Sequence, residues 1–149
     1  MPDLVGTWRL VGVISHDPDG KPLPPPYGSH PIGRIVFNTE GRIVVAVSDG
    51  RRELPASAKR EYGGYTGAFT FDGSTLTTHV DASPNPALVG TAQVRGVRIE
   101  GDDRIVLIPP PREIDSAIHH RELTWSGSAW CNDAARPAAD PCCPLCSTS

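Results

Sequence analysis

The chain has 149 residues, and its 15 glycines and 16 prolines interrupt regular structure throughout its length. This density of helix breakers excludes a bundle of long helices. No run approaches the ~20 apolar residues of a membrane-spanning helix, and a net charge of −3 disfavours non-specific nucleic-acid binding. We therefore expect one turn-rich, all-β domain that binds neither nucleic acid nor membrane.

Alternating apolar residues predict strands in the first third of the chain. Residues 4–14 alternate in this way, and one face is assigned Leu4, Trp8, Leu10 and Ile14. A proline-rich loop follows. Strands are then expected at 33–37 and 42–48, because the Asn-Thr-Glu-Gly segment between them is a hairpin signal. Ile35 and Phe37 share a face of the first arm.

The rest of the chain repeats this pattern at short intervals. Residues 56–62 follow a proline and are predicted to form a short helix. Further strands are expected at 65–71, 74–80, 89–100, 104–108 and 117–125. About eight short strands joined by tight turns are typical of a sandwich or an up-and-down barrel. Apolar alternation stops after Ser126, so the barrel domain is assigned to 1–126 and a tail to 127–149.

Several stretches resemble the lipocalin-like domain family of bacteria and fungi. They include Gly6-Thr7-Trp8 in the first strand, followed in order by 31–37, 65–69, 77–80, 89–95 and 123–125. The resemblance covers about residues 3–126. It implies an eight-stranded antiparallel up-and-down barrel with a cavity at one end, which suits one small ligand. It also implies that Trp8 closes the other end, where we expect Arg121 to stack over it by a cation–π contact.

Gln93 and Arg95 are the most informative polar pair. They alternate onto the face that carries Val97 and Ile99, so if those two apolar side chains point inward, Gln93 and Arg95 do as well. A guanidinium inside a barrel needs a partner, because burying it bare is costly. Two interpretations remain open. Arg95 pairs with an acid at the barrel mouth, or it binds a carboxylate, enolate or phenolate of an otherwise apolar ligand.

The predicted ligand-binding residues combine apolar walls with polar groups. They are Trp8, Ile35, Phe37, Tyr65, Phe69, Gln93, Arg95, His119 and Trp125. For Trp8 and Trp125, a place in the core is the competing interpretation. His119 and His120 point to opposite faces of a strand, and the alternation with Arg121 favours His119 as the inward one. The proline clusters at 22–26 and 109–111 indicate stiff loops at a cavity mouth.

The candidate catalytic residues are His79, Tyr65 and Arg95. The face of His79 is ambiguous, because Leu76 and Val80 indicate that His79 lies outside, whereas a ligand-lined barrel can reverse this pattern. Inside the cavity, its imidazole would suit a general acid or base near neutral pH. Tyr65 is the alternative acid or base, and Arg95 would stabilise an oxyanion.

The tail contains all four cysteines, namely Cys131, Cys142, Cys143 and Cys146. Its Ala-, Pro- and Cys-rich composition predicts a flexible, disordered segment. The spacing of Cys143 and Cys146 also suits zinc or redox chemistry, although adjacent cysteines bind one ion awkwardly. We expect no metal and no cofactor. The absence of a signal-like amino terminus predicts a cytoplasmic location.

Three functions follow from these features. The leading hypothesis is a monomer or homodimer that binds a small hydrophobic or aromatic organic molecule in the barrel cavity. The second is a cofactor-independent isomerase, cyclase or hydratase that uses the same cavity. The third is metal or partner binding through the cysteine tail. No nucleophile elbow, phosphate loop or dinucleotide-binding glycine pattern occurs in the sequence.

Overall fold

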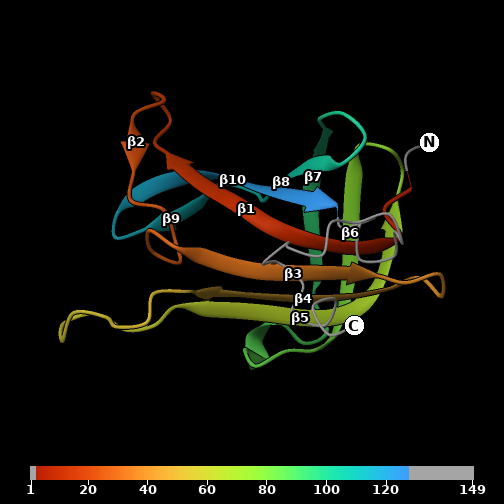
Figure 1. The fold of residues 1–149 in the computed structure, drawn as a ribbon, viewed down its shortest axis with the longest axis horizontal. Helices are drawn as coiled ribbons and strands as arrows, with labels where there is room; N and C mark the ends of the chain where they lie inside the picture. The colour runs from red at the N-terminus through yellow and green to blue at the C-terminus, as the bar shows by residue number, and fades with distance from the viewer. Residues whose placement is uncertain (1–2, 128–149) are drawn as a thin grey trace, which may run out of the picture.

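The computed structural model describes residues 3–127, which form a closed antiparallel β-barrel (Figure 1). The barrel strands are β1 (Gly6–His16), β3 (Pro31–Phe37), β4 (Arg42–Asp49), β5 (Tyr62–Phe71), β6 (Thr75–Ala82), β7 (Ala92–Ile99), β8 (Arg104–Ile108) and β10 (Ala117–Gly127). Each strand pairs with the next in this order, and β10 pairs back with β1, so the eight-stranded barrel closes. The predicted eight-stranded up-and-down barrel is confirmed.

Three short elements lie outside the barrel wall. β2 (Pro22–Leu23) pairs with β1, β9 (Arg112–Ile114) pairs with β10, and η1 (Pro86–Leu88) is a single 3-10 turn. β2, β9 and the loop between β4 and β5 lie toward the same end of the barrel, on the left in Figure 1. No helix within residues 3–127 has the length and apolar character needed to cross a membrane.

The predicted helix at residues 56–62 is wrong, because this segment is an irregular loop that leads into β5. The guanidinium of Arg60 holds the loop in place. Its Nη1 donates to the carbonyl oxygens of Asp49 at 2.7 Å and Arg51 at 2.6 Å, and Nη2 donates to that of Arg52 at 3.3 Å. The backbone N–H of Ala58 donates to the carbonyl oxygen of Pro55 at 2.9 Å, which is the i to i−3 bond of a turn and not the i to i−4 bond of an α-helix.

A β-bulge in β1 reverses the predicted orientation of Ile14. The register against β10 skips one residue between Leu10 and Gly12. A bulge adds one residue to one strand and so inverts the alternation beyond it. Val13 and Ser15 therefore point inward and are buried, whereas Ile14 is 58% exposed.

Trp8 closes the end of the barrel opposite β2 and β9. Its indole Nε1 donates to the carbonyl oxygen of Leu4 at 2.9 Å, and both residues are buried in the core. The ring lies so close to Gly127 that a Cβ there would be 3.1 Å from it. Arg121 does not stack on this ring. It pairs with Ser15, seven residues along β1 from Trp8, so the predicted cation–π contact is wrong.

Candidate ligand-binding cavity

The barrel contains a cavity of about 710 Å³. Its apolar walls come from strands spread around the barrel, namely Ile35, Val45, Val47, Leu107, Leu123 and Trp125. Trp125 is 1% exposed, and its indole Nε1 has no hydrogen-bond partner within residues 3–127. The inner part of the cavity is therefore apolar, with one buried donor left unsatisfied in its lining.

Loops at the end that carries β2 and β9 complete the lining. Pro26 contributes from the loop before β3, and Pro109, Pro110 and Pro111 contribute from the segment between β8 and β9. The segment around η1 adds Pro84, Asn85 and Leu88. The cluster at 109–111 therefore borders the cavity as expected, whereas of the cluster at 22–26 only Pro26 belongs to the lining. Proline fixes φ, so these rims are stiff.

Gln93 and Arg95 of β7 line the cavity and are partly buried, in agreement with the predicted alternation. The Nη2 of Arg95 donates to the Oε1 of Gln93 at 3.1 Å, and Nη1 donates to the carbonyl oxygen of Val94 at 2.9 Å. Both acceptors are neutral. Within residues 3–127 Arg95 takes part in no ion pair, so an acid at the mouth does not neutralise it there.

Two further arginines, Arg112 and Arg121, line the same cavity. Burial is the largest cause that lowers the pKa of Arg121, and the positive charges of Arg95 and Arg112 lower it further. The Nε of Arg121 is buried and has no hydrogen-bond partner in the described chain. Sequence reasoning placed Arg121 on the inward face with Leu123 and Trp125 but assigned it to the wrong end. Arg112 stood in no recognisable pattern and was missed.

Two tyrosines face these arginines. Burial raises the pKa of Tyr27, although the charges of Arg121, Arg95 and Arg112 act in the opposite direction. Burial also raises the pKa of Tyr65, which the sequence predicted as a site residue. Both hydroxyls therefore keep their protons at neutral pH and can donate hydrogen bonds into the cavity. Tyr27 lies in a loop and was not foreseen.

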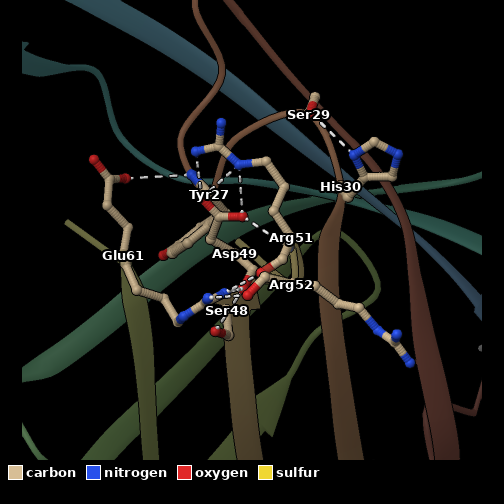
Figure 2. A network of polar contacts seen from close by, with 9 residues as sticks. Tyr27, Ser29, His30, Ser48, Asp49, Arg51, Arg52 and Glu61 are labelled. Atoms are coloured by element: carbon tan, nitrogen blue, oxygen red, sulfur yellow. Dashed lines mark hydrogen bonds and ion pairs between the residues drawn. The ribbon is translucent and has the colours of Figure 1, made fainter. Parts of the chain in front are cut away.

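A polar network holds the Tyr27 loop over the cavity (Figure 2). The carboxylate of Asp49, 2% exposed, accepts from Arg51 Nη2 at 2.7 Å and from Arg51 Nε at 3.1 Å. Glu61 accepts a hydrogen bond from the backbone N–H of Tyr27 at 3.2 Å.

Only a glycine fits at position 28 of this loop, because a side chain there would collide with the network. The φ of Gly28 is +71°, and a Cβ would lie 2.7 Å from Asp49 Oδ2. The position of Tyr27 therefore depends on the Asp49–Arg51 pair and on a glycine that lies directly against it.

Four of the predicted ligand-binding residues do not line the cavity. Phe37 packs against Phe69 edge-to-face, with 5.0 Å between ring centroids, and both belong to the core with Trp8. His119 is partly buried, but its Nδ1 lies 3.0 Å from the hydroxyl of Ser15. The cavity lining does contain the other predicted residues, namely Ile35, Tyr65, Gln93, Arg95 and Trp125.

His79 does not face the cavity, as a catalytic residue of that cavity would have to. Thr78 and Val80 on either side of it are buried, and His79 is exposed. Its imidazole therefore lies on the outer face of β6, as the alternation of Leu76 and Val80 indicated. The four cysteines lie outside the described residues.

These features define a small closed β-barrel with an internal cavity that is apolar inside and positively charged at its mouth. The chain matches the model of the lipocalin-like domain over residues 5–127 and belongs to that family. Such a barrel suits small hydrophobic ligands in general. Among solved structures, the chain is similar to a redesigned β-barrel at 12% identity and a TM-score of 0.40, covering 83% of this chain and 90% of that one. No curated protein matches the chain.

Proposed function

We propose that the protein binds one small, largely hydrophobic or aromatic organic molecule inside the barrel. The observation that carries this proposal is the cavity of about 710 Å³. Ligand pockets in proteins commonly measure about 300–1,000 Å³ and combine apolar walls with a few oriented polar groups. Ile35, Leu107 and Trp125 supply the walls, and Gln93 and Arg95 orient the polar end of the ligand.

Packing considerations support the same proposal. Protein interiors are close-packed, and an eight-stranded barrel is filled either by its own side chains or by one small ligand. Here large side chains fill the end around Trp8 and Phe37, whereas the other end contains the cavity. Gly63 and Gly64 of β5 keep its wall free of side chains at that end.

An enzyme on this scaffold is supported less well. The proposed catalysis requires an acid and a base beside the substrate, and His79 lies on the outer face of β6. Tyr65 lines the cavity, but its raised pKa makes it a hydrogen-bond donor at neutral pH and a poor base. Binding without a reaction is therefore the function that the geometry supports best.

The test uses the neutral fluorescent probe N-phenyl-1-naphthylamine and two neighbouring residues of β4. Val45 lines the cavity, whereas Val44 is 49% exposed on the outer face. We expect the wild type to bind the probe saturably. Val45→Trp fills part of the cavity and should weaken probe binding at least about tenfold, whereas Val44→Trp should bind as the wild type does.

Thermal unfolding monitored by circular dichroism checks that both variants remain folded. If Val45→Trp fails to fold, Val45→Phe takes its place as the smaller block. Equal probe affinity in the Val45 and Val44 variants would refute the proposal, as would the lack of saturable binding by the wild type.

A further inference from the structure

The mouth of the cavity concentrates positive charge in a chain whose net charge is −3. Arg95 comes from β7, Arg112 from the start of β9 and Arg121 from β10, and all three line the cavity. The described residues of that lining include no aspartate or glutamate. The strand β7 and the two consecutive strands β9 and β10 therefore bring three guanidinium groups to one opening.

These guanidinium groups lack acidic partners within residues 3–127. The ion pairs of this part of the chain involve Arg42, Arg51 and Arg98, all of which lie outside the cavity lining. Arg95 hydrogen-bonds to neutral acceptors, and the Nε of Arg121 is buried without a partner. The partly buried Arg121 therefore keeps an unsatisfied donor, which is costly away from water.

The electrostatics of the mouth also favour a negative group. The positive charges of Arg95 and Arg112 both raise the cost of charging Arg121. An anion placed among the three arginines would relieve this repulsion and would accept hydrogen bonds from their free N–H groups. The fork of a guanidinium matches a carboxylate, and a phenol adds a further donor.

We propose that Arg95, Arg112 and Arg121, together with the hydroxyl of Tyr27, bind the anionic head of an amphipathic ligand whose apolar body lies in the cavity. A carboxylate is the head group that fits best. This inference rests on the proposed function and specifies the class of ligand. The sources of such a ligand are fatty acids and aromatic acids, and the experiment distinguishes them.

The experiment measures displacement of N-phenyl-1-naphthylamine from the full chain by matched acids and alcohols. Decanoate is compared with 1-decanol, and 2-naphthoate with 2-naphthylmethanol. We expect at least one acid to compete at least about tenfold better than its alcohol. This advantage should shrink as salt is added, because the screening of charges weakens it. The better of the two acids identifies the kind of apolar body.

Single substitutions of the arginines then test whether the advantage of the acid over the alcohol depends on the mouth of the cavity. We expect each substitution to reduce the advantage of the acid by up to about tenfold and to leave competition by the alcohol unchanged. The substitutions are Arg95→Met, Arg112→Met and Arg121→Met. Arg98→Met is the matched control, because Arg98 lies three residues from Arg95 on the outer face of β7 and pairs with Glu100 and Glu122. It should behave as the wild type does.

The outcomes separate this inference from the proposed function. Equal competition by acids and alcohols would overturn the anion site, while the difference between the Val45 and Val44 variants would still support a binding cavity. An acid advantage that survives all three arginine substitutions would also overturn it. If the probe does not bind at all, the proposed function fails first.

Discussion

Two nitrogens of the Arg51 guanidinium, Nε and Nη2, donate hydrogen bonds to the carboxylate of Asp49, the last residue of β4. The shortest contact joins Arg51 Nη2 to Asp49 Oδ2 at 2.7 Å, and the carboxylate is buried (Figure 2). Gly28 of the Tyr27 loop lies directly against both groups. The pair therefore connects the end of a barrel strand to a loop that lines the cavity.

We predict that this pair makes stability depend on acid pH. Hydrogen bonds from Arg51 lower the pKa of Asp49 from 3.8 to about 2. A carboxyl with a lowered pKa in the folded state stabilises the fold above its unfolded pKa of about 4 and loses this contribution as the pH falls toward 2. Asp49→Asn should therefore be less stable than the wild type at neutral pH and should lose less stability between about pH 4 and pH 2.

Urea unfolding at a series of pH values measures this effect. Asp102→Asn, in the exposed turn after β7, is the control and should follow the wild type. A parallel loss of stability in Asp49→Asn and wild type across the acid range would contradict the prediction.

A second prediction concerns Gly67 of β5, which pairs with Val80 next to Asp81, the extra residue of a bulge in β6. A Cβ at this position would collide with the backbone carbonyl oxygen of His79 on β6. Gly67→Ala should destabilise the barrel by about 1–3 kcal/mol, because strand backbone must move to make room. Gly12→Ala is the matched control in β1, where a Cβ would meet nothing within 4 Å. Equal midpoints of chemical unfolding for the two variants would refute this prediction.

The third prediction separates the core from the cavity. Phe37 is 1% exposed and packs edge-to-face against Phe69 below the cavity. Phe37→Ala should cost about 3–5 kcal/mol in the free energy of unfolding, because it leaves a void in a packed core. Its neighbour Val36 is exposed, so Val36→Ala should cost far less. Phe37→Leu, which keeps the core filled, should retain the probe affinity of the wild type if Phe37 is not a ligand contact.

The fourth prediction is a conflict between stability and binding at the mouth. The pKa of Arg121 is lowered by burial and by two neighbouring positive charges, so its charge is unfavourable in the ligand-free barrel. Arg121→Met should therefore raise the melting temperature of the free protein by a few degrees while it weakens binding of the acid that displaces N-phenyl-1-naphthylamine. Arg98→Met breaks ion pairs and should not raise it. A fall in melting temperature for Arg121→Met would show that the guanidinium stabilises the free barrel.

Much of the fold could be predicted because every second side chain of a strand points to the same face, so a strand with one buried face has an apolar residue at every second position. This rule placed Ile35 and Phe37 inside on β3, and Gln93 and Arg95 inside on β7. It also indicated the outward position of His79, since Leu76 and Val80 are buried on the same strand. Local alternation therefore found the inward polar pair without a structure.

The rest depended on contacts between distant segments. The bulge between Leu10 and Gly12 exists only in the pairing of β1 with β10, so its effect on Ile14 was invisible in the sequence. The same register decides that Arg121 lies opposite Ser15 and not beside Trp8. Tyr27 reaches the cavity from a loop and Arg112 from the first residue of the short strand β9, and no periodicity in the sequence marks either position.

The pairing of β1 with β10 has a consequence for folding during synthesis. The barrel closes along a seam between its first and its last strand, and pairings so far apart in the chain form slowly. Until the ribosome has released residue 127, β1 and β8 each expose an unpaired edge that can join another chain. A chain interrupted before β10 is therefore expected to aggregate, whereas a circular permutant that links Gly127 to Asp3, and so keeps the buried Leu4, should place the slowest contact in a short hairpin and fold faster.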